Sequence, residues 1–181
     1  MKGGFYMKKI IIVLLILTLA FIATNYENKE VIIPRDSIRF RVIASSDNKK
    51  DQENKKIIAN NLKEDITNTL KDSKNIEESR LALKSNINEF KANIDETIKT
   101  NNINETYTIN YGNNYFPEKV YKGVKYKEGD YESLVVTLGD GSGENFWCVL
   151  FPPLCLLEGE EIDSDDIEYS SFIKEVIDKY F

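Results

Sequence analysis

The chain of 181 residues contains no histidine, only two cysteines and a single tryptophan. Without histidine it cannot form a Ser-His-Asp or Cys-His catalytic set of its own, and it lacks the imidazole ligands of common zinc sites. Two cysteines alone cannot build a four-thiolate site. Carboxylates remain as acid–base candidates, but they are spread over helix faces and loops. We therefore expect a protein that is not an enzyme, with no catalytic residue, no metal site and no cofactor.

Positive charge is also scarce, because 24 lysines and arginines face 30 aspartates and glutamates. Three of the lysines, Lys2, Lys8 and Lys9, lie in the N-terminal leader, so the rest of the chain is more acidic still. A nucleic-acid partner requires a basic face that neutralises phosphates. Anionic lipid attracts the same kind of face. We expect neither of these partners, and no small-molecule substrate.

The leader has a basic start followed by residues 10–23, which carry no charge. That order is typical of an export signal, whereas a membrane span needs about 20 apolar residues. Two interpretations stay open: residues 1–24 are a signal peptide, or they are an uncleaved N-terminal membrane anchor. Residues 25–34 are expected to form a polar tether and residues 35–181 the exported domain. Met7, directly before Lys8, is an alternative start to Met1.

The N-terminal half of the exported domain predicts one strand and two helices. Ile38, Phe40 and Val42 alternate with Arg39 and Arg41, which is typical of a half-buried strand with its arginines in solvent. Apolar residues recur every third or fourth position over two later segments. These predict an antiparallel pair of amphipathic helices with a short connection, at about residues 50–71 and after residue 75 to about residue 99.

The C-terminal half predicts strands and one last helix. Alternating or β-branched stretches lie at residues 107–111, 120–121, 124–126, 132–138 and 145–151, and a helix is predicted at about residues 167–180. Gly139–Gly143 lacks the lysine and helix of a phosphate loop and the spaced acids of a calcium loop, so we interpret it as a turn. It predicts a hairpin between the last two strands. The fold class is α+β, with a mostly antiparallel sheet packed against the helix pair, plus the C-terminal helix.

The segment from Phe146 to Cys155 contains no charged residue, although 30% of the chain is charged. Such a run is either buried or used for binding. The same two interpretations apply to an aromatic-rich group formed by residues 114–117 and Tyr121, with Tyr126 and Tyr131 nearby. Cys148 and Cys155 predict either a disulfide outside the cytoplasm or two buried thiols. The candidate partner-binding residues are Tyr115, Phe116, Pro117, Trp147, Phe151, Pro152, Pro153 and Leu154.

Four segments, residues 38–47, 116–121, 129–134 and 139–155, resemble the stage II sporulation protein R family of endospore-forming bacteria. The last segment is long and compositionally unusual, which makes the likeness specific. Departures are Phe146, where the family tends to have a second tryptophan, and Lys127-Glu128, where Pro-Ala is usual. The resemblance covers nearly all of the exported domain, from about residue 38 to residue 156, and it implies that this chain is a signal and not a protease.

The resemblance also implies a function. The protein would be exported from the forespore into the intermembrane space, and it would activate a membrane-embedded aspartic protease of the mother-cell septal membrane. That protease, the expected partner, cleaves the precursor of sigma factor E. Two alternatives come from other classes: a cell-envelope hydrolase that uses carboxylates, and a structural envelope protein.

Overall fold

The computed structural model describes residues 11–18, 31–121, 123–154 and 166–181. The chain divides into two units, residues 1–30 and residues 31–181. In the first unit, residues 11–18 are helical. No helix in the described ranges combines the length and apolarity that a membrane crossing requires. Most of the predicted leader lies outside the described residues, so signal peptide and anchor both stay predictions.

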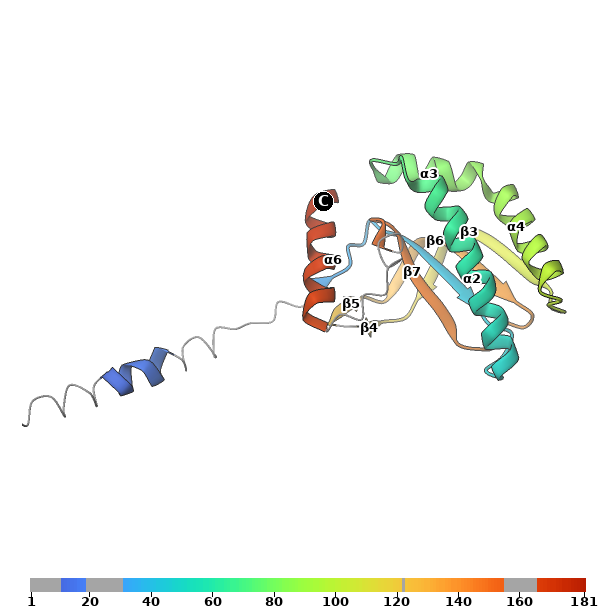
Figure 1. Cartoon of the computed structure of the whole chain (residues 1–181). Coiled ribbons are helices and arrows are strands. Elements are labelled where there is room, and N and C mark those ends of the chain that lie inside the picture. The colour runs from blue at the N-terminus through green and yellow to red at the C-terminus, as the bar shows by residue number, and fades with distance from the viewer. Residues whose placement is uncertain (1–10, 19–30, 122, 155–165) are drawn as a thin grey trace, which may run out of the picture. The chain divides into compact units, whose positions relative to one another are not determined.

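The second unit is built on a four-stranded sheet with the order β3-β6-β2-β7 (Figure 1). Strand β2 (Ile38–Ile43) runs parallel to β6 (Gly129–Leu138) and antiparallel to β7 (Asn145–Phe151). Strand β3 (Tyr107–Phe116) pairs antiparallel with β6 along its whole length. The predicted α+β class with a mostly antiparallel sheet is confirmed.

The predicted hairpin between β6 and β7 is wrong, because β2 lies between these two strands. Their connecting loop crosses the end of β2: the Ser142 backbone N–H donates to Ser45 O at 3.2 Å, and that of Gly143 donates to Ala44 O at 3.0 Å. A Cβ atom on Gly143 would lie only 2.4 Å from Ser46 O. The glycines therefore allow close approach to a third strand, which a hairpin pattern alone cannot reveal.

Helices α2 (Lys49–Leu70), α3 (Ile76–Ser85) and α4 (Ile87–Thr100) pack on one face of this sheet (Figure 1). Asn48 caps α2 by accepting a hydrogen bond from the Asp51 backbone N–H at 2.9 Å. The apolar faces of the helices and the strands form the main core. Its fully buried members include Phe40, Val42, Ile58, Leu62, Ile66, Leu83, Phe90, Ile94, Leu134 and Val136.

The second predicted helix is divided in two at Asn86. The side-chain amide of Asn86 donates to Ala82 O at 2.8 Å, and its backbone N–H is shared between the carbonyls of Ala82 and Leu83. Asparagine side chains compete with the helical hydrogen-bond ladder in this way. The periodicity persists across the break, because Leu83, Phe90 and Ile94 are all buried. The apolar periodicity therefore predicted one continuous helix.

A smaller three-stranded sheet has the order β1-β5-β4. Strands β4 (Lys119–Tyr121) and β5 (Val124–Tyr126) form the predicted hairpin, and Gly123 adopts a φ of 74° in its turn. Strand β1 (Val31–Ile32) pairs parallel with β5. This strand lies within residues 25–34, for which the polar tether stays a prediction.

Helix α6 (Asp166–Tyr180), close to its predicted bounds, closes a second core next to the small sheet (Figure 1). The buried members of this second core are Ile33, Val124, Val149, Leu154, Ile173 and Val176. Because Val149 comes from β7, this core joins the small sheet to the edge of the large one. Both faces of the large sheet are thus at least partly covered.

Candidate functional site

A pocket of about 260 Å³ lies between the two sheets. It is bounded by one side chain of β2, residues of β4 and β5, the first five residues of β7 and the turn that follows β7. The pocket is lined by Arg39, Lys119, Tyr121, Tyr126, Asn145, Phe146, Trp147, Cys148, Val149 and Leu154. Two of these residues are cations and none is an acid, although the chain has a net charge of −6. The site therefore differs in both charge and aromatic content from the rest of the molecule.

Arg39 was expected to face solvent, but it is only 2% exposed. Its guanidinium carbon lies 3.3 Å from the ring centre of Tyr131 and 5.2 Å from that of Phe116. The Nε and Nη2 atoms of Arg39 are buried and have no hydrogen-bond acceptor among the described residues. Burial lowers the pKa of Arg39, and the neighbouring Tyr131 acts in the opposite direction. Ring stacking stabilises the charge but does not replace hydrogen bonds to these nitrogens.

Two further cations surround the only tryptophan. The Arg41 guanidinium carbon and the Lys119 Nζ each lie 5.5 Å from the ring centre of Trp147. Arg41 also lies 4.9 Å from the ring centre of Phe116, which packs edge-on against Trp147 at 5.1 Å. Cations over aromatic faces are attracted by the ring quadrupole. Trp147 is thereby held in place at the pocket wall.

A second residue of the pocket wall, Asn145, also has an unsatisfied polar atom. Asn145 Oδ1 is buried and accepts no hydrogen bond from any described residue. Buried polar atoms are hydrogen-bonded in the great majority of cases, so each exception calls for an explanation. The pocket therefore presents both cationic donors and a neutral acceptor.

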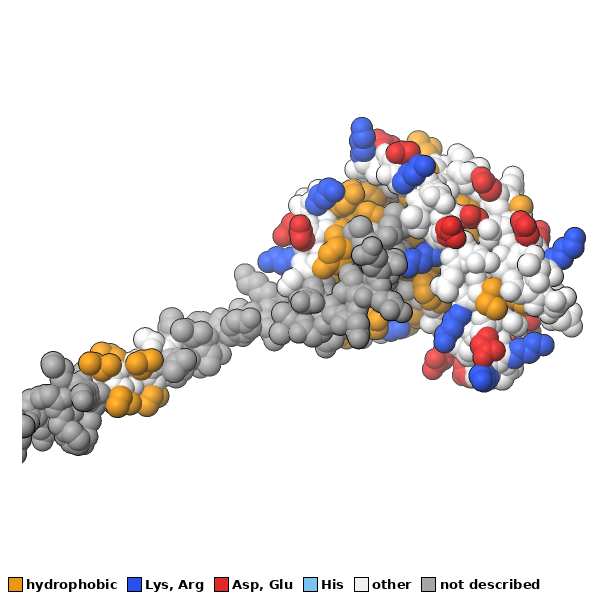
Figure 2. Space-filling model, viewed as in Figure 1, with side chains coloured by type: hydrophobic (Ala, Val, Ile, Leu, Met, Phe, Trp, Pro, Cys, Tyr) orange, Lys and Arg blue, Asp and Glu red, His pale blue; other side chains and the backbone are white. Residues whose placement is uncertain are grey.

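The rim of the pocket carries exposed apolar surface on an edge strand. All three residues of β4 are exposed, and it lies at the end of its sheet. Val120 is 60% exposed and Tyr121 is 47% exposed. Edge strands pair readily with added strands, and exposed aromatics are common at interfaces. Elsewhere, Figure 2 shows acidic and basic side chains interspersed over the helical face.

The structure places the candidate residues predicted from the sequence in different environments. Trp147 and Leu154 both line the pocket. Tyr115 and Pro117 are exposed, and Pro153 is half-buried. Buried members are Phe116, Phe151, Pro152 and Leu154.

The buried members of the set have packing roles. Phe151 packs edge-on against Tyr180 at 5.4 Å and Phe181 at 6.2 Å, and its peptide bond to Pro152 is cis. Phe151 therefore supports the position of β7, and in this structure it presents little surface to a partner.

Sequence reasoning did not anticipate Arg39, Lys119 or Asn145 as site residues. The alternation in β2 placed Arg39 on a solvent face, and nothing in its local sequence indicates that a second sheet covers that face. Tyr121 and Tyr126 belonged to the recognised aromatic-rich group, for which both packing and binding were open. Both residues line the pocket.

Two other predictions concern cysteines and metals. Cys148 lies on β7, but Cys155 lies outside the described residues, so the disulfide stays a prediction. Within the described part of the chain, no group of three or more acidic residues or cysteines is arranged to hold a metal ion.

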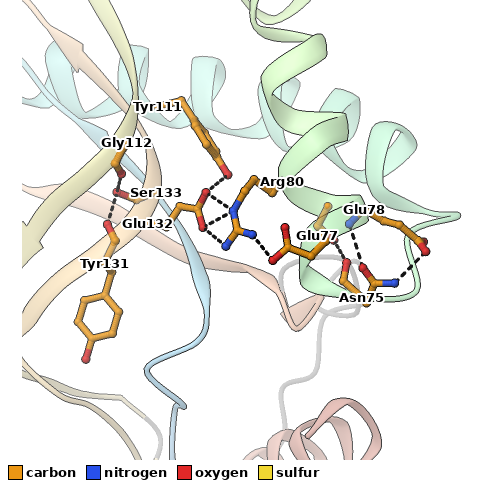
Figure 3. A network of polar contacts seen from close by, with 10 residues as sticks. Asn75, Glu77, Glu78, Arg80, Tyr111, Gly112, Tyr131, Glu132 and Ser133 are labelled. Atoms are coloured by element: carbon orange, nitrogen blue, oxygen red, sulfur yellow. Dashed lines mark hydrogen bonds and ion pairs between the residues drawn. The ribbon is translucent and has the colours of Figure 1, made fainter.

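The best-formed carboxylate cluster, drawn in Figure 3, shares no residue with the lining of the pocket. Arg80 of α3 donates to both oxygens of Glu132 on β6, at 2.7–2.9 Å, and the Tyr111 hydroxyl donates to Glu132 Oε1 at 2.8 Å. Hydrogen bonds from Arg80 are the main cause that lowers the pKa of Glu132, and burial raises the pKa of Tyr111. Glu77 also pairs with Arg80. Both Glu77 and Glu132 contact Arg80, so we interpret this network as a link between helix and sheet.

Comparisons with known proteins agree with one another. The sequence model of the family described as stage II sporulation protein R matches residues 34–161. The stage II sporulation protein R of Bacillus subtilis (strain 168) is 38% identical over 152 residues, covering 82% of this chain and 68% of the relative. No solved structure matches the chain. The chain therefore belongs to the stage II sporulation protein R family, and its role is in sporulation.

Proposed function

We propose that this protein is an exported signal made in the forespore. In the intermembrane space it activates a membrane-embedded aspartic protease of the mother-cell septal membrane, which then cleaves the sigma factor E precursor. Family membership supports the sporulation role, and the basic and apolar leader supports export. The protein itself transforms no substrate.

One observation carries the proposal of a binding role: the pocket combines unsatisfied buried donors with an exposed apolar rim. The described lining residues include no carboxylate, and the whole chain has no histidine, so acid–base catalysis has little support there. The same features suit recognition, because aromatic and arginine side chains dominate the energetics of many interfaces.

Activation by binding sets an energetic requirement. A ligand shifts its receptor only by its differential affinity for the active state. Moving a receptor from about 1% to about 99% active requires roughly 10⁴-fold tighter binding to the active form. Val120, Tyr121 and Trp147 supply apolar contact area for such a difference, and Arg39 supplies charge. The surface formed by β4 and the pocket is therefore the proposed receptor contact.

Reconstitution tests the proposal directly. The full chain, the protease and the precursor are co-expressed in a non-sporulating host, and precursor cleavage is followed by immunoblot. Cleavage is expected only when the chain is present and carries residues 1–24. Equal cleavage with a chain confined to the cytosol would contradict the proposal, as would cleavage of the precursor by the chain without the protease.

A further inference from the structure

The side chains that line the pocket indicate which class of ligand it binds. We infer that it binds a carboxylate presented by an extended peptide segment of a partner protein, with Arg39 as the anion-binding residue. The inference deepens the proposed function and rests on it in one respect, since the carboxylate is taken to belong to a partner.

The first support is the state of the Arg39 side chain. It is almost fully buried and stacked on Tyr131, which fixes the plane of its guanidinium group. Two of its nitrogens, Nε and Nη2, lack acceptors among the described residues. These two atoms form the side of a guanidinium group that binds a carboxylate with two parallel hydrogen bonds. The stacking therefore holds in a fixed orientation the two N–H groups of Arg39 that can bind a carboxylate.

The second support is the charge of the surroundings. Lys119 lines the same pocket, and the described lining residues include no acid that would neutralise either cation. Burial destabilises the charged form of Arg39, since it lowers the pKa of this group. An incoming carboxylate would restore the lost interactions, and it would do so where water screens the attraction poorly. The chemistry favours an anion over a neutral ligand.

The third support identifies the anion as part of a peptide. Asn145 Oδ1 needs a donor, and a peptide carries amide N–H groups close to any carboxylate on it. Lys119 and Tyr121 lie two residues apart on β4 and both line the pocket. An extended peptide paired with this edge strand would thus pass beside the pocket, which is a common mode of peptide recognition.

The size of the pocket limits what enters it. Its volume of about 260 Å³ lies below the range of roughly 300–1,000 Å³ typical of drug-sized ligand sites. One or two side chains fit this space. The apolar part of the lining, Phe146, Val149 and Leu154, favours an apolar residue next to the carboxylate.

Trp147 makes a direct test practical, because it is the only tryptophan and it lies in the pocket wall. The purified full chain is titrated with two matched pairs of peptides while tryptophan emission is recorded. One pair is acetyl-leucine-glutamate-phenylalanine amide and its glutamine counterpart. The other is acetyl-leucine-phenylalanine with a free terminal carboxylate and the same peptide as an amide. The pairs separate a side-chain carboxylate from a chain end.

We expect saturable binding of at least one carboxylate peptide, with its neutral counterpart at least about tenfold weaker. Arg39→Met should abolish this preference, and Arg39→Lys should retain only part of it. Arg35→Met is the matched control, because Arg35 is exposed and does not line the pocket. Equal binding of both members of each pair would overturn the inference. So would no binding at concentrations up to about 10 mM.

A stability measurement separates this role from a purely structural one. An arginine kept for binding leaves unsatisfied donors in the unbound protein, so its replacement by methionine should leave the melting temperature unchanged or raise it. A marked fall in melting temperature would assign Arg39 to core packing and overturn the inference. Peptide binding that persists while protease activation fails would instead count against the proposed function alone. Activation without any carboxylate preference would count against the inference alone.

Discussion

The guanidinium carbon of Arg39 lies 3.3 Å from the ring centre of Tyr131, and both side chains are buried. The two residues come from the parallel neighbours β2 and β6, and they form the floor of the region covered by the small sheet. This contact places a fixed charge inside a domain whose other buried residues are mostly apolar. The proposed recognition of a carboxylate depends on this contact.

The stacking predicts an energetic coupling between Arg39 and Tyr131. Tyr131→Leu should lower the free energy of unfolding in the wild-type chain by more than it does in an Arg39→Met chain. The difference should be about 0.5–2 kcal/mol, the range of a cation–π contact that is removed from water. Urea unfolding of the four proteins measures it.

Tyr115→Leu is the control for that cycle, since Tyr115 is 56% exposed. It should change stability by less than about 0.5 kcal/mol. A coupling energy of zero would mean that the ring merely fills space.

The Arg80–Glu132 pair predicts a pH-dependent contribution to stability. Glu132→Gln should cost about 1–3 kcal/mol at neutral pH, because charge-assisted hydrogen bonds to Arg80 are lost. The pKa of Glu132 is lowered in the folded chain, chiefly by these bonds. Its contribution is therefore complete above the unfolded pKa of about 4.3 and disappears as the pH falls through the lower folded value.

Thermal unfolding of both proteins between neutral and acidic pH tests this dependence. Glu53→Gln serves as the control, because Glu53 belongs to an exposed pair with Lys49 at 3.8 Å. Exposed pairs contribute about 0–1 kcal/mol. A stability difference for Glu132→Gln that stayed constant with pH would contradict the assignment.

The loop that crosses the end of β2 predicts a specific requirement for glycine. Gly143→Ala should destabilise the fold by about 1–3 kcal/mol, because the new methyl group would collide with the Ser46 backbone. Gly112→Ala makes the same chemical change where the nearest atom is 3.9 Å away, and it should be tolerated. Chemical denaturation of the two variants provides the comparison. Equal tolerance at both positions would show that the loop readily moves aside.

The exposed β4 edge predicts a variant that loses signalling without losing its fold. Val120→Asp should strongly reduce precursor cleavage in the reconstituted system and leave the melting temperature unchanged, since Val120 is 60% exposed. Leu81→Asp introduces the same charge at a residue that is 66% exposed on α3, and it should retain full activity. Loss of cleavage with both variants would indicate a nonspecific charge effect.

For Phe151 we expect the opposite result to that for Val120, namely that its replacement lowers the stability of the fold. It is 4% exposed and packs against the C-terminal helix, so Phe151→Ala should destabilise the domain by about 3–5 kcal/mol. Any loss of signalling in that variant should follow the loss of folded protein, as measured by circular dichroism. A stable but inactive Phe151→Ala protein would restore this side chain as a direct partner contact.

A disulfide between Cys148 and Cys155, one of the two alternatives that the sequence leaves open, would close the turn after β7. We expect no reactive thiol in the denatured, exported protein, and reduction should lower stability by about 2–3 kcal/mol, as estimated for a short closed loop. Thiol titration with and without reductant decides the matter. Two reactive thiols before reduction would instead identify Cys148 and Cys155 as unpaired.

Local patterns in the sequence predicted α2, the β4–β5 hairpin and α6 close to their observed bounds. These elements depend on side-chain periodicity, capping residues and glycine turns, all of which act over a few neighbouring residues. The break at Asn86 was missed because the apolar spacing continues through it. Trp147 and Leu154 were also predicted as site residues from composition alone. An uncharged run in a highly charged chain has to be buried or to bind a partner.

Only the tertiary structure decided where β2 lies and what covers it. Strand pairing is a contact between distant segments, so a loop that suits a hairpin also suits a crossing over a third strand. The burial of Arg39 follows from that placement, since the small sheet closes over a face that alternation assigns to solvent. The sequence by itself thus determined the helices, the turns and the family, whereas long-range packing created the charged pocket.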